Sequence, residues 1–252
     1  MEAKWNPWHG CHKLSEGCRN CYVYRMDARY ERDACQVHLN QNAGNVPIAK
    51  DRSGSYKYPS GTVFYTCFTS DFFVEDADEW RKDAWEIMKK RNDLRFVFFT
   101  KRIERLAAVL PPDWGDGYEN VTIGCTCENQ TRADQRLPVF LSLPIHRRVI
   151  VCEPLLGEID LRPYLDRALI EEVAAGGESG DGARVCDFAW IERIGRDCAA
   201  SGIRFSYHQT GALLRRDGKL YRIPRRLQHE QAKRAGVDVK GYSFHAHTDE
   251  KH

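Results

Sequence analysis

Three cysteines close to the N-terminus have the residue type and the spacing that metal chemistry needs. Cys11, Cys18 and Cys21 follow the pattern C-x6-C-x2-C within WNPWHGCHKLSEGCRNCY, the segment Trp5–Tyr22. Two glycines interrupt this segment, and glycine allows both a close backbone approach and positive φ angles. The segment can therefore fold as a loop that directs three thiolates toward one centre.

The number of thiolates bears on which metal the loop would hold. A structural zinc site normally closes its coordination sphere with a fourth Cys or His. A [4Fe–4S] cluster held by three cysteines instead leaves one iron open to a cofactor or substrate. We favour the cluster. Two alternatives stay open: a Cys3His zinc knuckle that uses His9 or His12, and three unrelated structural thiols.

Seven further cysteines lack this spacing. Cys67 stands beside the polar run Thr69–Asp71 and is the one that we expect to be reactive. Since side chains alternate between the two faces of a strand, cysteines next to inward-pointing acidic residues should face the helices as small apolar packing groups. We expect structural roles for the remaining six, which are Cys35, Cys125, Cys127, Cys152, Cys186 and Cys198.

Short apolar or β-branched runs recur along the chain and predict buried strands. They start 22 to 33 residues apart, the length of a β-α unit. The pattern predicts an α/β fold, a partial or complete TIM-like (β/α) barrel with six to seven parallel strands. The expected strands are Thr62–Cys67, Arg95–Thr100, Asn120–Cys125, Arg148–Cys152, Ile170–Ala175 and Ile203–Tyr207, with a seventh at Trp5–Trp8. The expected helices are Asp78–Arg91, Arg102–Val109, Thr131–Leu143 and Phe188–Ser201.

Polar residues follow nearly every predicted strand. In a β/α barrel the chemistry lies at the carboxyl ends of the strands. Buried charges cost free energy unless they are paired, so a rim of such residues favours a functional role. The glycine-rich turn within Ala174–Arg184 could also direct backbone N–H groups at a carboxylate or a ribose. The strand-end groups are Thr69–Asp71, Thr100–Arg102, Thr126–Asn129, Glu153–Pro154, Gly176–Ser179 and His208–Gln209.

Composition bounds the class of protein. The chain has 252 residues, of which 42% are hydrophobic and 29% charged, as in an ordinary globular protein. It has no run of about 18 apolar residues, so we expect no membrane-spanning helix. Ten cysteines without a secretory signal indicate a reducing compartment, and we expect a cytoplasmic protein. We expect a barrel domain over residues 1–211 and a basic extension over 212–252 packed on it.

The extension contains the main concentration of charge. The segment Leu213–Gly236 has eight basic residues and two acidic ones, although the whole chain carries only +2. Asp217-Gly218 predicts a hairpin turn within it, and a basic helix should follow Pro224. Such a segment would suit phosphates, so DNA, RNA or a nucleotide is a candidate partner. Elsewhere, Asn40–Ser60 should form a long surface loop or lid, and His245–His252 a frayed polar end.

The motifs together resemble a known family. WNPWHGC, SEGCRNCY, FTSDFF, FFTKRIERL, GCTCENQ, ADQRL, CEPLLG and GGESGDGAR are similar to the phage gene product thirty-seven/sixty-eight family, a three-cysteine-motif family of bacteria and phages. The resemblance runs from Trp5 to about Gly211. That family is similar in turn to radical S-adenosylmethionine enzymes, in which three cysteines hold [4Fe–4S] after the first strand of a partial barrel. The most common spacing in those enzymes is C-x3-C-x2-C, and the first interval here is longer.

The resemblance implies a cofactor and a chemistry. Cys11, Cys18 and Cys21 would ligate three irons of a [4Fe–4S] cluster, and the fourth iron would take the amino and carboxylate groups of S-adenosylmethionine. Reductive cleavage would give a 5′-deoxyadenosyl radical that abstracts hydrogen from a substrate. The electrons would come from a reductase or from a flavodoxin or ferredoxin.

Roles for the strand-end residues follow from the same resemblance. Ser70 and Asp71 would meet the methionine amino group, and Lys101 or Arg102 would pair with its carboxylate. Glu128 would suit the ribose hydroxyls. The far side of the cofactor would be lined by Gly176, Gly177 and Glu178.

Four residues at the strand ends are catalytic candidates. They are Cys67, Lys101, Glu153 and His208. The family's last strand ends Lys-Gln-Trp-Gly, whereas this chain has His208-Gln209-Thr210-Gly211. His208 therefore stands where the family has a lysine, which puts the role of that lysine in doubt.

The sequence thus admits three functions. The first is a radical S-adenosylmethionine enzyme with an unassigned substrate. The second is a zinc-knuckle protein that binds nucleic acid, or a phage accessory protein, without catalysis. The third is an iron–sulfur protein that transfers electrons and binds no S-adenosylmethionine. The metal content of the protein distinguishes the second from the other two.

Overall fold

The computed structural model describes residues 1–240, so the expected polar end His245–His252 lies outside the described residues. The chain divides into two compact units. The first comprises Met1–Cys125 and Ser142–Arg147, and the second Thr126–Leu141 and the chain from Arg148 onward. The expected division at residue 211 stays a prediction. Among the described residues, no helix is both long enough and apolar enough to cross a membrane.

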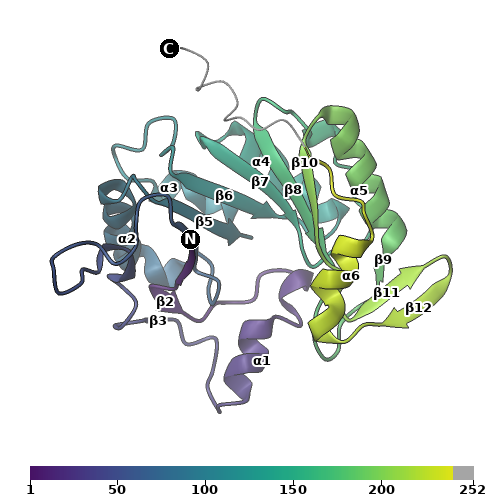
Figure 1. Cartoon of the computed structure of the whole chain (residues 1–252), viewed down its shortest axis with the longest axis horizontal. Coiled ribbons are helices and arrows are strands. Elements are labelled where there is room, and N and C mark those ends of the chain that lie inside the picture. The colour runs from purple at the N-terminus through teal and green to yellow at the C-terminus, as the bar shows by residue number, and fades with distance from the viewer. Residues whose placement is uncertain (241–252) are drawn as a thin grey trace. The chain divides into compact units, whose positions relative to one another are not determined.

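Seven parallel strands form the main sheet, in the order β1-β4-β5-β6-β7-β8-β10 (Figure 1). Within this sheet, all the strand pairings inside each unit are parallel. The expected α/β fold with parallel strands is confirmed, and it is compatible with a partial barrel. Six expected strands agree with the structure to within two residues at each end. The seven strands are β1 (Glu2–Trp5), β4 (Val63–Thr66), β5 (Arg95–Thr100), β6 (Val121–Thr126), β7 (Arg147–Cys152), β8 (Ile170–Gly176) and β10 (Arg204–Gln209).

The expected N-terminal strand was wrong in its position. The parallel strand is Glu2–Trp5, paired with β4 so that Trp5 lies opposite Thr66. Pro7 has no N–H to donate to a sheet, and it follows closely after the strand. The next two residues, β2 (Trp8–His9), pair instead in the antiparallel direction with β3 (His38–Leu39).

Three of the four expected helices are present, and the fourth is shorter than expected. The residues expected to form a helix over Arg102–Val109 form a 3-10 turn, Ile103–Arg105, followed by only one α-helical turn. The helix α1 directly after the cysteine loop was not expected. The α-helices are α1 (Tyr22–Ala28), α2 (Asp78–Lys90), α3 (Leu106–Val109), α4 (Gln130–Ser142), α5 (Phe188–Ser201) and α6 (Gln228–Arg234). Further 3-10 turns are Glu16–Cys18, Val46–Ile48, Glu75–Ala77, Arg162–Tyr164 and Arg225–Leu227.

An aromatic cluster in the first unit fixes the segment that follows β4. The rings of Phe72 and Phe98 stack with their centroids 4.2 Å apart, and Trp85 meets Phe72 edge-on at 4.8 Å. All three side chains are buried. Since aromatic rings bury large areas and prefer such geometries, this packing anchors Asp71 at the carboxyl end of β4.

The expected loop over Asn40–Ser60 is confirmed as a mostly exposed loop. The buried Arg91, at the end of α2, ties it down. Its guanidinium donates to the carbonyl oxygens of Pro47 and Tyr58, the latter at 2.8 Å. These two bonds attach the loop to the end of α2 at Pro47 and at Tyr58.

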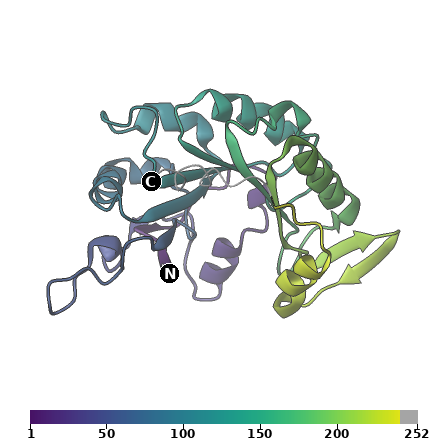
Figure 2. The ribbon, with the colours of Figure 1, turned by 45° about the horizontal axis from the view of Figure 1, so that its top comes forward.

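The basic segment of the second unit forms the expected hairpin and helix. Strands β11 (Leu213–Arg216) and β12 (Lys219–Arg222) are antiparallel, and β11 also pairs with β9 (Cys186–Asp187). Asp217 and Gly218 have φ angles of 50° and 73°, as a two-residue type I′ turn requires. Figure 2 shows the hairpin and α6 in yellow-green beside the green helix α5. The helix begins at Gln228, after the turn that follows Pro224.

Helix α5 begins with a cap that we expect to contribute to stability. Asp187 is its N-cap, and the carboxylate accepts a hydrogen bond from the backbone N–H of Ala189 at 3.0 Å. Asp187→Ala should lower the free energy of unfolding by about 1 kcal/mol in urea denaturation, because this N–H loses its partner. Asp187→Asn keeps an accepting oxygen and should unfold like the wild type. Equal losses in both variants would contradict the assignment.

Candidate functional site

The cysteine loop lies in the first unit, between β2 and α1. Cys11, Cys18 and Cys21 are free thiols, each half-buried. Cys18 ends the 3-10 turn Glu16–Cys18, and Cys21 directly precedes α1. Regular structure on both sides therefore positions the second and third thiols, and the backbone contacts of Gly10 and Cys11 position the first.

Cys11 is held by its backbone neighbours. Its N–H donates to the carbonyl of Ala34 at 2.8 Å, and the N–H of Gly10 donates to Thr69 at 3.1 Å. Gly10 has a φ of 92°, and a Cβ there would lie 2.9 Å from the Ala34 oxygen. Only glycine fits this position without strain. The positive φ expected for the loop glycines is thus confirmed at Gly10.

Cys18 and Cys21 lie near enough to Cys11 to affect its pKa. Burial raises the pKa of Cys11 to about 12, and the charge of Asp71 adds to the effect. Negative charge on Cys18 or Cys21 shifts the Cys11 pKa in the same direction. Within residues 1–240, no three His, Cys, Asp or Glu side chains are already arranged around a point where a single metal ion would sit.

A buried ion pair lies beside the first thiol. Asp71 and Arg102 are 6% and 4% exposed. The Arg102 guanidinium lies 3.5 Å from the Asp71 carboxylate, donates to the carbonyl of His12 at 2.8 Å, and approaches the Cys11 sulfur at 3.6 Å. Burial alone would lower the pKa of Arg102, but the charges of Asp71 and Cys11 outweigh it and raise the pKa. A fixed positive charge therefore faces Cys11.

Asp71 organises the ends of β4 and β5. Its carboxylate accepts from the Thr100 hydroxyl at 2.7 Å and from the N–H groups of Lys101 and Phe73, each at 3.0 Å. With the contact from Arg102, both carboxylate oxygens have partners. The structure thus shows a scaffolding role for this residue, while the expected contact with a methionine amino group stays a prediction.

The other predicted residues of the first unit differ in their burial and in their contacts. Ser70 donates its hydroxyl to the carbonyl of Gly10 and so ties β4 to the cysteine loop. Lys101 is half-buried, and its ammonium forms no ion pair within residues 1–240. Cys67 is buried with a φ of 58°, and burial raises the pKa of its thiol well above the ordinary value. Its thiol is therefore neutral, which gives no support to a nucleophilic role.

The histidines of the loop already have carboxylate partners. Nε2 of His9 lies 2.7 Å from Asp27, and Nε2 of His12 lies 2.6 Å from Asp76. A zinc knuckle would have to use Nδ1 of one of these rings. Carboxylates often orient metal-binding histidines in this way, so the contacts leave that alternative open.

Tyr24, a residue of α1, supports the loop through a hydrogen bond that the sequence did not predict, although its ring was expected near the cysteines. Its hydroxyl donates to the carbonyl of Cys11 and lies 3.4 Å from the sulfur of Cys35. The amphipathic signal of α1 is too short to stand out, since the helix has seven residues. The sequence signal for this contact is the spacing: Tyr24 follows Cys21 by three residues, which is nearly one helical turn.

In the second unit, Glu153, His208 and Gln209 form one hydrogen-bonded group. Nδ1 of His208 lies 2.8 Å from one carboxylate oxygen of Glu153, and the Gln209 amide donates to the other. The His229 ring packs against His208 with centroids 4.7 Å apart. The hydrogen bond to Glu153 and the negative charge there raise the pKa of His208. An exposed imidazole with an oriented carboxylate partner has the geometry of a general acid or base.

The two other predicted carboxylates are neutralised by arginines. Glu128 is fully buried, and Arg136 lies 2.6 Å from its carboxylate. Glu178 accepts from the backbone N–H of Arg184 at 2.9 Å and pairs with its guanidinium at 2.5 Å. Buried carboxylates are stable in such pairs. The predicted contacts of Glu128 with ribose hydroxyls, and of Glu178 with the cofactor, stay predictions.

The glycines after β8 make a close backbone contact. A Cβ on Gly176 would lie 2.9 Å from the Glu153 carboxylate, and one on Gly177 only 2.3 Å from the carbonyl oxygen of Thr210. Gly177 also donates its N–H to Gln209 at 3.0 Å. The close packing of the ends of β8 and β10 therefore explains these residues. Their predicted role against a cofactor has no test in this structure.

The structure thus brings the predicted residues together in two groups. The group of the first unit contains the three thiols together with Ser70, Asp71, Lys101 and Arg102. The group of the second unit contains Glu153 and His208 with the two glycines. Of the remaining residues, Cys67 is buried close to Asp71 and Cys11 of the first group. Glu128 and Glu178 form ion pairs with Arg136 and Arg184.

A family model described as "Protein of unknown function (DUF5131)" matches residues 1–248. The chain belongs to this family. No curated protein and no solved structure matches the sequence significantly. For this DUF5131 member, the two groups of residues are therefore the features that indicate a function.

The pair of Glu153 and His208 in this DUF5131 protein predicts a pH dependence. Because the pKa of His208 is raised above 6.5 in the folded protein, the pair stabilises the fold fully below about pH 6.5, and that contribution is lost as the pH rises through the raised pKa. Glu153→Gln should move the His208 pKa back toward its ordinary value in an NMR titration of the histidine rings.

The matched control is Glu172→Gln, on the same sheet. Glu172 accepts from Ser206 at 2.6 Å and from Arg204, and neither contact involves His208. This variant should leave the His208 titration unchanged. If Glu153→Gln also leaves it unchanged, the carboxylate does not control the imidazole.

Proposed function

We propose that this protein is an iron–sulfur enzyme of the radical S-adenosylmethionine type. In this proposal Cys11, Cys18 and Cys21 hold a [4Fe–4S] cluster, and the remaining iron takes S-adenosylmethionine. The observation that carries it is the loop itself: three half-buried free thiols, two of them close enough to Cys11 to affect its pKa, follow a backbone turn that only glycine fits at position 10.

The donor set suits such a cluster. Iron–sulfur clusters are held by thiolates, and three of them leave one iron open. Their potentials respond to nearby charge and to hydrogen bonds at sulfur. Arg102 supplies both beside Cys11, where its guanidinium lies 3.6 Å from the sulfur. A cationic donor would stabilise the thiolate form that ligation requires.

The parallel α/β sheet supports the same proposal. The loop follows the first strand, and strand-end residues of β4 and β5 lie against it, through Ser70 and through Arg102. When bound, the cluster would supply an electron for the cleavage of S-adenosylmethionine to a 5′-deoxyadenosyl radical. The residues of the protein have simpler tasks: Asp71 fixes Arg102, and Lys101 offers a cation without an ion-pair partner among the described residues.

The second group adds a place for proton transfer. His208 is exposed and is oriented by Glu153, so it can accept or give a proton at Nε2 while Nδ1 stays hydrogen-bonded to the carboxylate. An imidazole held in this way can exchange a proton with a substrate group that reaches it. The phage family that the sequence resembles has a lysine at this strand end, and a lysine would also be able to accept or give a proton there.

Metal analysis tests the proposal. After anaerobic reconstitution the wild type should contain about four iron and four sulfide per chain. The Cys11/Cys18/Cys21→Ser triple variant should lose them. Cys35→Ser is the matched control, because Cys35 is exposed and lies beside the loop through Tyr24; it should keep them. Reduced wild type incubated with S-adenosylmethionine should release 5′-deoxyadenosine.

Each result that differs from this pattern would support a different function. One zinc per chain and no sulfide would overturn the cluster and support the zinc knuckle. A full cluster without 5′-deoxyadenosine would support electron transfer instead. A cluster lost in Cys35→Ser would show that four thiols hold it, which leaves no open iron.

The charge at Arg102 gives a second prediction. Arg102→Met removes the cation beside Cys11, so the reconstituted cluster should have a lower midpoint potential in an EPR-monitored redox titration. Arg102→Lys keeps the charge and should lie between Arg102→Met and the wild type. A potential that is the same in all three proteins would show that Arg102 only holds the loop, through its bonds to His12 and Asp71.

A further inference from the structure

The hairpin β11–β12 and the residues after it concentrate the positive charge of the chain. The segment Leu213–Gly236 has eight basic and two acidic residues and so carries +6, while the whole chain carries +2. The remaining residues therefore carry −4. This contrast makes the segment a local cation rather than part of a uniformly basic surface.

Most of these cations have no carboxylate beside them. Three form ion pairs: Arg215 with Asp187 at 3.8 Å, Arg216 with the exposed Asp217 at 3.8 Å, and Arg234 with Glu230 at 2.5 Å. The other five form none within residues 1–240. We call these five the free cations: Lys219, Arg222, Arg225, Arg226 and Lys233.

One face of the hairpin covers an aromatic cavity of about 300 Å³. Residues that pair directly across the two strands share a face, and the pairing of Arg216 with Lys219 and of Leu214 with Tyr221 defines this one. The cavity walls include Phe188, Tyr207 and Tyr221. Tyr221 is 46% exposed, so an aromatic ring borders the opening.

Tyr207, one wall of the cavity, has a buried hydroxyl with no partner within residues 1–240. Tyr207 is 3% exposed, and its hydroxyl forms no hydrogen bond in the described part of the chain. Buried tyrosine hydroxyls usually find a partner. A nucleobase is flat and has polar edges. It would therefore hydrogen-bond to this hydroxyl while its face packs on an aromatic wall.

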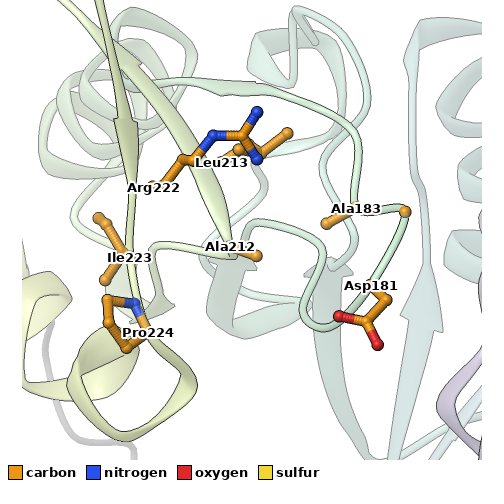
Figure 3. Close-up of a pocket in the computed structure, with 8 residues that line it drawn as sticks. Asp181, Ala183, Ala212, Leu213, Arg222, Ile223 and Pro224 are labelled. Carbon is orange, nitrogen blue, oxygen red and sulfur yellow. The ribbon is translucent and has the colours of Figure 1, made fainter.

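The other face of the hairpin borders a larger hollow of about 460 Å³. Figure 3 shows Arg222, Ile223 and Pro224 along one side of it, and Asp181 and Ala183 across from them. Arg222 is one of the free cations. Free cations therefore lie on both faces of the hairpin, Lys219 on the face of the aromatic cavity and Arg222 beside this hollow.

We propose that this surface binds single-stranded nucleic acid. The free cations contact successive phosphates, and one base enters the aromatic cavity, where Tyr221 stacks on it and the Tyr207 hydroxyl bonds to its edge. An unpaired strand fits because only unstacked bases offer both a face and a free edge. The inference goes beyond the iron–sulfur chemistry and does not depend on it, since binding needs no cluster.

Fluorescence anisotropy with a labelled single strand of about 20 nucleotides, as DNA and as RNA, tests the proposal. Affinity should fall steeply between about 50 and 200 mM salt. Lys219→Ala/Arg222→Ala/Arg225→Ala/Arg226→Ala should weaken binding at least tenfold and reduce the salt dependence. A matched control removes four exposed cations of the first unit: Arg29, Arg32, Lys82 and Lys90. It should bind like the wild type.

The cavity has its own variants. Tyr207→Phe removes one buried oxygen and keeps the ring, so the fold should persist, as circular dichroism can verify. It should change the order of affinities for the four homopolymers, and Tyr221→Ala should weaken all of them by roughly fivefold or more. Unchanged homopolymer binding in both variants would overturn the placement of a base in the cavity.

Two further results would overturn the surface itself. The first is equal weakening in the quadruple variant and its control, which would show only a general charge effect. The second is wild-type binding to vesicles of phosphatidylserine and phosphatidylcholine that matches its binding to the oligonucleotide, which would indicate a membrane surface. A duplex bound more tightly than its single strand would also contradict the proposal.

Discussion

One buried carboxylate organises the first unit. Asp71 accepts from Thr100, from the backbone of Lys101 and Phe73, and from Arg102. A charge at 6% exposure is stable only when its partners surround it. Those partners come from the ends of both β4 and β5, so the carboxylate joins the two strand ends. Through Arg102 it also reaches His12 and Cys11. The position of the first thiol therefore depends on an ion pair that contains no cysteine.

The second unit uses close packing for the same purpose. Backbone atoms after β8 and β10 approach so closely at Gly177 and Gly211 that no side chain fits between them. This contact sets the end of β10 beside β8, while Leu155, just after Glu153, donates its N–H to Gly176. The Glu153 carboxylate then lies within reach of His208. Close backbone packing therefore positions the strand-end residues of the second unit, as the buried carboxylate does in the first unit.

The strands were predictable because their apolar runs are nearly continuous, as in β6 and β7, where almost every residue is buried. The same rule placed the first strand too late, because it counted Trp8 and ignored Pro7 between the two tryptophans. Polar strand ends were predictable as a class, but their partners were not. The pairing of Asp71 with Arg102 depends on the register of β4 against β5, in which Tyr65 lies opposite Val97. No periodicity encodes that register, and none reveals that the Tyr207 hydroxyl lacks a partner among the described residues.

Burial separates the ten cysteines by the chemistry open to them. Six are buried, and for four of these, Cys67, Cys152, Cys186 and Cys198, burial raises the pKa and keeps the thiol neutral. Neutral buried thiols behave as small apolar groups. The other four are the three of the loop and Cys35, which lies beside Tyr24. Burial raises the pKa of Cys11 as well, yet the Arg102 guanidinium donates to the Cys11 sulfur. The half-buried thiols of this loop, rather than the buried cysteines, are therefore the ones to which we assign the proposed metal.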